Sequence, residues 1–587
     1  MLAVVQSCLG KNELALANYD RALVLQPRHA EALSNRGNAL KALGRFDLAL
    51  KSYDRAILFQ PDYATAHSNR GAVLSVLKRP EDALASYDRA LALRPDHVEA
   101  HYNRGHVLNE LKRHAEALAS YDRVLALRPD FVEAYSNRGN ALNALKRHDE
   151  ALASYDRALA LRPDLAEAHC NRGNASHALG RFDEALVSFE RALALRPDYA
   201  EAHYNRGATL HELKRYDEAL ASYDRAIAAK PDYAAAYSNR GASLYELRRF
   251  DEALASYDRA LIADPDYPEA HWNAASLRLL TGDFARGWAE YEWRWTYERM
   301  APARRDFKQP LWCGTDDIAG KMVLLTSEQG FGDTIQFSRF ATGVAARGAR
   351  VVLEVEKPLQ RLMRSLAGPA EVLTKGSPLP EFDLHCPLLS LPLAFGTELA
   401  TIPAQTPYLS APASAAATWE ARLPRGGRRT IGLSWSGNAM HVRDKNRSID
   451  LAGLLPLLDV DATFVSVQKD MRPADAALLT ERGDIRHFGA SLDDFAETAA
   501  LVAQLDLIIS VDTSAAHLAG ALGKPVWVLL PRIPDWRWLL DRDDSPWYPT
   551  ARLFRQDDTA TWDGVIVRVR EALFAFVRSE GLLPAGR

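Results

Sequence analysis

The sequence predicts an α-solenoid followed by two α/β lobes, and three observations support this fold class. Proline recurs every 34 residues through the first half of the chain, and asparagine recurs at the same interval. After about residue 320, short apolar runs alternate with helical segments. A fixed period of this length indicates stacked helical repeats. Alternating strands and helices indicate parallel sheets with crossover helices.

Composition limits the class of protein. The chain has 587 residues and a net charge of −4, which predicts two to four domains and argues against a nucleic-acid binder. The four cysteines lie far apart without a CxxC pair, so we expect neither a zinc site nor a disulfide framework. No apolar run reaches the roughly 18 residues of a membrane span, and the first residues lack the features of a signal peptide. We therefore expect a cytoplasmic protein.

One repeat extends from Val98 to Phe131. The pattern predicts a helix to about Leu111, a basic turn, and a second helix that Pro129 blocks from continuing. This period, with small residues such as Gly105 where helices approach, resembles the tetratricopeptide repeat. The resemblance covers roughly residues 1–300, which we assign to a repeat superhelix with a C-terminal cap. Stacked repeats form a continuous core and a concave groove.

Asparagine occupies one position of the first helix in each repeat. Because its side chain competes for backbone hydrogen bonds, asparagine is a mediocre helix former, and its repetition needs an explanation. The repeats resemble those of O-linked N-acetylglucosamine transferases, which implies that these amides bind the backbone of a polypeptide in the groove. Alternatively, they bond to neighbouring repeats. The candidate peptide-binding residues are Asn35, Asn69, Asn103, Asn137, Asn171, Asn205 and Asn239.

Two further features accompany the repeats. The arginine that follows most of these asparagines, such as Arg104, predicts either a basic lining or pairing with acidic residues of the next repeat. Residues 281–299 keep helical spacing but add Trp288, Trp293 and Trp295. Because a terminal repeat needs an atypical face, we interpret this stretch as a cap that docks onto the next domain. An aromatic ligand platform is the alternative.

The second half divides into lobes at residues 301–425 and 426–587. We expect strands at 322–326, 350–355, 371–373, 430–435, 463–467, 485–487, 507–510 and 526–530. Two such lobes resemble the GT-B glycosyltransferase fold, with substrates at the carboxyl ends of the strands. Three motifs resemble the heptosyltransferase-like glycosyltransferases of family 9. They are Gly332-Asp333, Lys445-Asn446-Arg447 and the stretch 512–525, DTSAAHLAGALGKP.

The third motif predicts a phosphate site. Asp512 ends an apolar strand, and Thr513 and Ser514 begin a helix whose N–H groups and hydroxyls favour a diphosphate. In the family, the matching Asp contacts the donor sugar and the next residues contact the phosphates. His517 lies one turn further and would bind a phosphate or fix the turn. The alternative for the first three residues is a helix N-cap.

A cation near the donor would neutralise the leaving diphosphate. Lys445 matches the lysine of the family best, and Arg443 and Arg447 are rivals; the alternative is a solvated basic loop. Gln468 follows another strand and is a candidate contact to the nucleotide.

The turn after the first strand of the first lobe contains the candidate base. The resemblance implies that Asp333 takes the proton from an acceptor hydroxyl, a role that contributes about 10²–10⁴ in rate. Glu328 is the rival base, and the alternative for Asp333 is a helix cap. No DxD motif has a clear metal geometry, so we expect no metal or cofactor. The helix dipole and nearby cations would stabilise the leaving phosphates in place of a metal ion.

The motifs and their resemblance together predict a metal-independent glycosyltransferase that moves a sugar from a nucleotide-sugar to a polypeptide hydroxyl, and the resemblance alone implies that it is inverting. Similar repeat–transferase fusions modify flagellin, which makes a flagellin-like acceptor the leading expectation. The alternatives are a repeat scaffold or chaperone with a degenerate transferase domain, or transfer to a lipid or polysaccharide.

Overall fold

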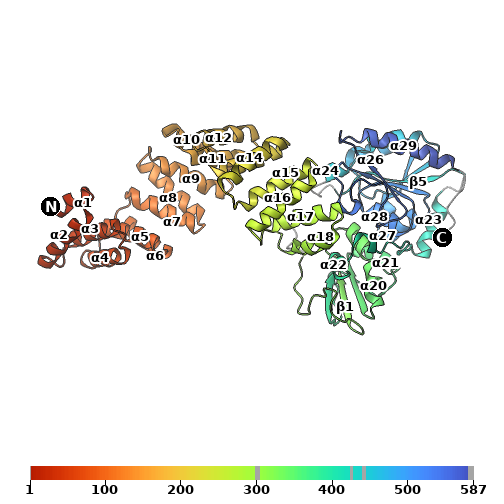
Figure 1. Ribbon diagram of the computed structural model, residues 1–587, viewed down its shortest axis with the longest axis horizontal. Helices are drawn as coiled ribbons and strands as arrows, with labels where there is room; N and C mark the ends of the chain where they lie inside the picture. The colour runs from red at the N-terminus through yellow and green to blue at the C-terminus, as the bar shows by residue number, and fades with distance from the viewer. Residues whose placement is uncertain (1, 298–303, 424–426, 439–443, 580–587) are drawn as a thin grey trace. The chain divides into compact units, whose positions relative to one another are not determined.

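The computed structural model describes residues 2–297, 304–423, 427–438 and 444–579. The chain divides into two compact units, Met1–Ser243 and Leu244–Arg587 (Figure 1). The boundary falls inside the repeats, within helix α15, so the last repeat helices belong to the same unit as the two sheets. No described helix has both the length and the apolar character that a membrane crossing requires.

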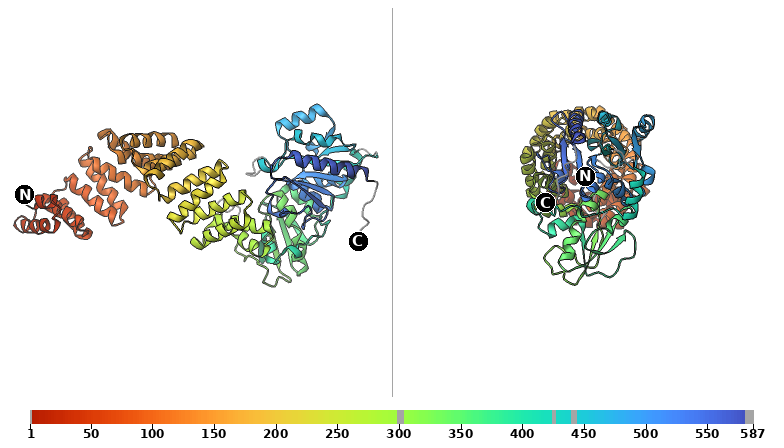
Figure 2. Two further views of the ribbon diagram at one scale, coloured as in Figure 1. Left: turned by 45° about the horizontal axis from the view of Figure 1, so that its top comes forward. Right: turned by 90° about the vertical axis from the view of Figure 1, so that its right-hand side faces the viewer.

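The first unit consists of paired antiparallel helices, one pair for each 34-residue period (Figures 1 and 2). Its helices are α1 (Leu2–Cys8), α2 (Asn12–Leu25), α3 (Ala30–Ala42), α4 (Phe46–Phe59), α5 (Ala64–Val76), α6 (Pro80–Leu93), α7 (Val98–Glu110), α8 (His114–Leu127), α9 (Val132–Ala144), α10 (His148–Leu161), α11 (Ala166–Ala178), α12 (Phe182–Leu195), α13 (Ala200–Glu212), α14 (Tyr216–Ala229) and most of α15 (Ala234–Glu246).

A glycine in the first helix and a tyrosine in the second set the packing within most pairs. A Cβ atom at Gly105 of α7 would lie 2.7 Å from Cε1 of Tyr121 in α8, and one at Gly71 would lie 2.8 Å from Tyr87. Both tyrosines are buried. The ring of the second helix therefore occupies the space that a larger side chain in the first helix would need, which explains the predicted need for small residues.

The second unit begins with helices that complete the repeats. They are α16 (Phe250–Ala263), α17 (Pro268–Thr281), α18 (Phe284–Tyr291) and the 3₁₀ turn η1 (Glu292–Trp295). Trp288 of α18 makes edge contacts with Phe337 of the first lobe, with ring centroids 6.2 Å apart, and with Trp536 of the second lobe, at 5.2 Å. The tryptophan-rich cap thus packs on both lobes, as the sequence predicts.

The first lobe is a four-stranded parallel sheet in the order β3-β2-β1-β4. Its strands are β1 (Met322–Thr326), β2 (Arg350–Val355), β3 (Pro369–Thr374) and β4 (Leu384–Pro387). Its helices are α19 (Phe331–Phe337), α20 (Phe340–Ala346), α21 (Gln360–Met363) and α22 (Leu391–Ala394), with α23 (Ala413–Arg422) leading onward. The apolar spacing of residues 334–347 predicts one helix, but the structure divides this stretch between α19 and α20.

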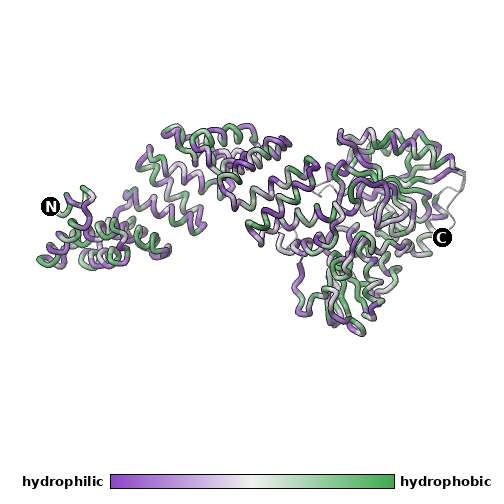
Figure 3. Tube along the Cα trace, in the orientation of Figure 1, coloured by the Kyte–Doolittle hydropathy of each residue, from purple (hydrophilic) through white to green (hydrophobic). Residues whose placement is uncertain are grey.

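The second lobe is a six-stranded parallel sheet in the order β10-β9-β8-β5-β6-β7. Its strands are β5 (Thr430–Ser434), β6 (Thr463–Ser466), β7 (Ile485–His487), β8 (Leu507–Val511), β9 (Val526–Leu530) and β10 (Ala551–Arg555). Its helices are α24 (Asp444–Arg447), α25 (Leu451–Leu454), α26 (Pro473–Arg482), α27 (Phe495–Ala503), α28 (Ser514–Ala521) and α29 (Asp563–Arg578). Apolar residues concentrate along the strands of both sheets (Figure 3).

Candidate functional site

The turn after β1 begins helix α19 with a capping carboxylate. Asp333 Oδ2 accepts a hydrogen bond of 2.8 Å from the Gly330 N–H, so the cap that we weighed as the alternative for Asp333 is present. Asp333 Oδ1 is bound by Arg537 of the second lobe. The Asp333 side chain keeps 19% of its surface exposed. The carboxylate is therefore fixed from two sides but is not sealed from solvent.

Gly332 brings the motifs of the two lobes into contact. A Cβ atom at this position would lie 2.8 Å from His517 Cδ2 and 3.6 Å from Ser514 Cα. The start of α19 therefore packs directly on the start of α28, and only glycine allows so close an approach. Two stretches that lie some 180 positions apart in the chain, 332–333 and 512–517, meet at one place.

Arg537 is the functional candidate that sequence reasoning missed. It lies in the 3₁₀ turn η8 (Trp536–Trp538), its side chain is 8% exposed, and its Nη1 donates to Asp535 Oδ1 at 2.7 Å. Burial alone would lower the pKa of Arg537, but the carboxylates of Asp535 and Asp333 hold that pKa above its usual value. The guanidinium therefore stays charged and links both lobes. In the sequence, the only feature that could have drawn attention to Arg537 is its position between Trp536 and Trp538.

Asp512 and His517 lie in the buried part of this cluster. His517 Nε2 is 3.8 Å from Asp512 Oδ1, and His517 Nδ1 is hydrogen-bonded to the Tyr548 hydroxyl at 3.0 Å. Burial and the neighbouring Asp535 raise the pKa of Asp512 to about 6. Burial and the charge of Arg537 lower the pKa of His517 to about 3, so the imidazole is neutral at pH 7.

The start of α28 is a helix N-terminus, as the sequence predicts, and phosphate binding there stays a prediction. Thr513 and Ser514 are half-buried, and the Thr513 hydroxyl is shared with Ser510 at 3.1 Å rather than capping the helix. Within the described part of the chain, no hydrogen bond engages the backbone N–H groups of Ser514 or Ala515. Such groups at a helix N-terminus favour phosphate oxygens.

The four donor-side candidates of the β5 and β6 loops differ in environment. Arg447 lies near the cluster, because its charge lowers the pKa values of both Asp512 and His517. Lys445 is exposed, and Arg443 lies outside the described residues. Gln468 is buried, and its amide is engaged by Ser434, Ser436 and Asp470. In this structure Gln468 shapes the loop after β5, and its contact with a nucleotide stays a prediction.

Glu328 has a different set of partners from Asp333. Its carboxylate accepts hydrogen bonds from Arg294 Nε at 3.0 Å and Nη2 at 3.1 Å, and from the Leu389 N–H at 3.1 Å. Burial raises the pKa of Glu328, although Arg294 opposes that shift. The observed role of this carboxylate is to join η1 to the first lobe, and its role as a base stays a prediction.

The seven asparagines of the repeats are all half-buried, and five donate an amide N–H to the preceding repeat. Asn69 and Asn171 donate to Asn38 and Asn140, at 3.1 and 2.9 Å. Asn137 and Asn239 donate to the hydroxyls of Tyr102 and Tyr204, both at 3.0 Å, and Asn205 reaches Cys170 Sγ at 4.0 Å. The bonding to neighbouring repeats is therefore real. Their binding of a polypeptide stays a prediction.

The arginine beside each asparagine forms a regular link between repeats. Arg104 donates to Asp88 of the preceding repeat at 2.7 Å and to Ser120 of its own repeat at 2.8 Å. Arg138 repeats the pattern with Asp122 and Ser154. Of the two explanations that the sequence allows, acidic pairing is the one observed. The acidic partner lies in the preceding repeat, whereas we expected the next.

The raised pKa of Asp512 gives a prediction for stability. Because the folded pKa, about 6, exceeds the ordinary 3.8 of an aspartate, this group contributes stability that is present below pH 4 and is lost as the pH rises through 6. Asp512→Asn removes the buried charge and is expected to raise stability at pH 8 by about 2 kcal/mol.

Thermal unfolding of parent and variant between pH 4 and pH 8 would measure this difference. It should shrink toward zero at pH 4, where Asp512 is protonated in the folded parent. A constant difference at every pH would mean that charge burial is not its cause.

Comparison with known proteins identifies the repeats. Models described as TPR repeat match residues 9–44, 37–75, 139–180 and 173–214, and models described as tetratricopeptide repeat match residues 73–130, 200–233 and 234–267. The repeats are tetratricopeptide repeats. Such repeats are protein-interaction scaffolds, and they indicate a peptide or protein partner for this chain.

A curated relative is Protein FlbA of Caulobacter vibrioides, which is 26% identical over 337 residues. The match covers 52% of this chain and 55% of FlbA, so this chain spans about half the length of that protein.

Similar solved structures include YrrB, described as a TPR protein with an unusual peptide-binding site. It is 29% identical, covers 32% of this chain and 96% of its own, and has a TM-score of 0.29. A tetratricopeptide repeat protein from Parabacteroides merdae is 19% identical, covers 42% of this chain and 97% of its own, and has a TM-score of 0.35.

Proposed function

We propose that this chain is a glycosyltransferase that moves a sugar from a nucleotide-sugar to a hydroxyl of a polypeptide held by the tetratricopeptide repeats. One observation supports it most. The Asp512–His517 motif at the start of α28 packs against Gly332-Asp333 at the start of α19, with Arg537 bound to Asp333. A scaffold alone would not need an anion-binding helix start beside a partly exposed carboxylate.

The proposed reaction is a single displacement at the anomeric carbon. The acceptor oxygen forms a bond to that carbon while the bond to the diphosphate oxygen breaks, and the leaving diphosphate keeps the electron pair. Asp333 receives the proton of the acceptor hydroxyl. The N–H groups at the start of α28 and the charge of Arg447 stabilise the departing phosphates. The configuration at the anomeric carbon inverts.

Arg537 would act as a positioning residue in this reaction. It binds Asp333 Oδ1, while the Gly330 N–H binds Oδ2. Both contacts hold the carboxylate in one orientation at the start of α19. A base that is fixed before the substrate arrives needs little reorganisation during the reaction.

The acceptor side of the proposal rests on the repeats. Their asparagines are half-buried at one helical position of successive repeats, and an amide can donate to and accept from a peptide backbone. Each such bond contributes about 0.5–1.5 kcal/mol, so several together give useful affinity. The resemblance to repeat–transferase fusions makes flagellin the first acceptor to test.

A second candidate function is a non-catalytic scaffold. It is favoured by the structural contacts that several candidate residues make: Asp333 caps α19, Gln468 holds its own loop, and Glu328 joins η1 to the first lobe. Under this alternative, the chain binds a protein partner but no nucleotide-sugar.

Calorimetry with UDP-, GDP-, ADP- and CMP-sugars separates the two functions. We expect one of them to bind, and Ser514→Asp to weaken that binding at least tenfold, about 1.4 kcal/mol, because the new carboxylate repels the diphosphate. Ser414→Asp is the matched control, since Ser414 is an exposed residue in the first turn of α23. It adds the same charge away from the motif.

Binding of none of these sugars would contradict the transferase and favour the scaffold. Equal weakening by both serine variants would show that net charge, rather than the start of α28, affects binding. Mass spectrometry of co-expressed flagellin then tests the acceptor, because transfer adds the mass of one sugar.

A further inference from the structure

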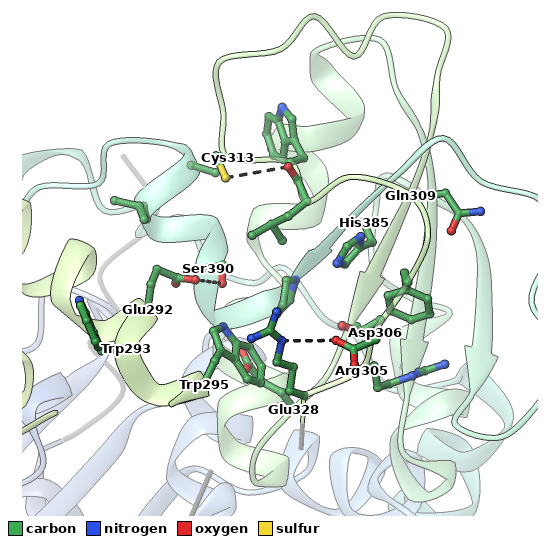
Figure 4. A pocket seen from close by; sticks show the side chains of 18 of the residues that line it. Glu292, Trp293, Trp295, Arg305, Asp306, Gln309, Cys313, Glu328, His385 and Ser390 are labelled. Atoms are coloured by element: carbon green, nitrogen blue, oxygen red, sulfur yellow. Dashed lines mark hydrogen bonds and ion pairs between the residues drawn. The ribbon is translucent and has the colours of Figure 1, made fainter. Parts of the chain in front are cut away.

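A cavity of about 650 Å³ lies between the cap and the first lobe, and Glu328 is part of its lining. One wall is formed by α18 and η1 of the cap, another by the connector 304–313, and the floor by the carboxyl ends of β1 and β4 (Figure 4). The carboxyl ends of parallel strands are where open α/β sheets bind ligands. The volume falls within the range of small-molecule sites, about 300–1,000 Å³. It is much larger than one amino-acid side chain requires.

Aromatic and polar side chains share the lining. Trp293, Trp295 and Phe307 are half-buried and line the cavity. One neighbour already packs on each ring: His271 on Trp293 at 3.9 Å, Arg294 on Trp295 at 4.3 Å and Arg305 on Phe307 at 4.7 Å, so a ligand would use the remaining surface of each ring. Glu292 and Gln309, also half-buried, add a carboxylate and an amide. Flat rings pack against the C–H faces of a ring-shaped ligand, whereas a carboxylate and an amide bind hydroxyl groups. The lining is therefore mixed rather than simply apolar.

The charge on the cavity floor disfavours an anionic ligand. Arg294 is fully buried and binds Glu292 at 2.7 Å, Glu328 at 3.0 Å and Ser390 at 2.7 Å. One positive charge is thus shared by two carboxylates, which leaves a negative charge in excess. The guanidinium already makes hydrogen bonds with all of these partners.

The arginines of the connector do not reverse this balance. Arg305 pairs with the buried Glu354, and Arg304 lies 3.5 Å from Asp306. Burial lowers the pKa of His385, so its imidazole is neutral at pH 7. Phosphates and carboxylates in a ligand would meet a net negative wall, whereas hydroxyl groups would find acceptors in it.

From this lining we propose that the cavity between η1, the connector 304–313 and the ends of β1 and β4 is a binding site for a neutral carbohydrate unit. Trp293, Trp295 and Phe307 offer apolar faces for the sugar ring. The Glu292 carboxylate accepts hydrogen bonds from its hydroxyls, and the Gln309 amide can accept from them and donate to them. Binding needs only this cavity and does not depend on sugar transfer or on a nucleotide.

Calorimetric titration of the full chain with N-acetylglucosamine and glucose tests the site. At about 0.3 kcal/mol for each non-hydrogen atom, one such sugar binds with a Kd of about 1 mM. Ala289→Trp is expected to raise this Kd at least tenfold, because Ala289 lines the cavity from an exposed position of α18 and an indole there occupies the space. Ala285→Trp, one turn earlier on the same helix and also exposed, is the matched control.

Sugar binding that Ala289→Trp abolishes and Ala285→Trp retains would support the site. The same titration is repeated with inorganic phosphate and UMP as anionic probes and with arginine methyl ester as a cationic probe. Absence of sugar binding, equal binding by both variants, or binding of an anionic or cationic probe in place of the sugars would overturn the proposal. Because no nucleotide-sugar is present, these outcomes are independent of donor binding at Ser514.

Discussion

Asp333→Asn is expected to lower the rate of sugar transfer about 10²–10⁴-fold, the usual contribution of a positioned base. The amide has almost the same shape as the carboxylate, and its oxygen can still accept the hydrogen bond from the Gly330 N–H. The helix cap is therefore largely kept, while the site that receives the proton is lost. Steady-state kinetics with the donor identified by calorimetry would show the loss in kcat rather than in donor affinity.

Thermal melting separates a base from a cap at this position. If Asp333 accepts the proton, Asp333→Asn loses activity while its melting temperature stays close to that of the parent. An active variant with a lowered melting temperature would limit Asp333 to capping α19. The partly exposed surface of this side chain is what allows a hydroxyl to reach it.

Arg537→Met is expected to destabilise the second compact unit by about 3 kcal/mol, the lower end of the range for breaking a buried ion pair. Methionine keeps much of the side-chain volume but leaves the largely buried Asp333 without its cationic partner. We expect a value at the lower end of this range because Asp535, the other partner of Arg537, is about one third exposed. Its carboxylate can therefore be solvated by water when the guanidinium is removed. Hydrogen exchange of the backbone around η8 and α19 in the full chain measures the change.

Arg542→Met is the control for this experiment. Arg542 pairs with Asp544 at 2.6 Å, but Asp544 is 66% exposed, so the loss of this pair costs about 0–1 kcal/mol. The double variant Arg537→Met, Asp333→Asn should recover part of the stability, since it no longer leaves an unpaired carboxylate. Equal effects of Arg537→Met and Arg542→Met would mean that the link between Arg537 and Asp333 does not stabilise the two lobes.

Much of the fold was predictable because its signals are local. Each repeat packs mainly on its neighbours, so the spacing of Pro129 and Gly105 within one period is enough to define the unit. The buried strands appear as short apolar runs, and the eight expected strands are present. β4 and β10 were missed. β4 has four residues that include His385 and Pro387, and β10 places arginines at both ends of a short apolar stretch.

The candidate site was only partly predictable, because its contacts join distant parts of the chain. Asp333, Asp512 and His517 could be recognised from their motifs. Their link to Arg537 could not, since that residue pairs with Asp333 over 204 positions and no spacing rule connects them. In the same way, the partner of Asn69 is Asn38, on the facing helix of the preceding repeat, which only the packing of the two helices reveals.

The boundary between the two compact units, within α15, determines which repeats can be gained or lost without disturbing the two sheets. Helices α16 to α18 are structural parts of the body that holds both sheets, since Trp288 contacts Phe337 and Trp536 and Arg294 binds Glu328. Repeats before Ser243 contribute none of these contacts. Gain or loss of whole 34-residue repeats before Ser243 would change the surface that is available to a protein partner and leave the second unit intact. Deletion of the repeat that contains α17 and α18 would instead remove contacts that stabilise the second unit.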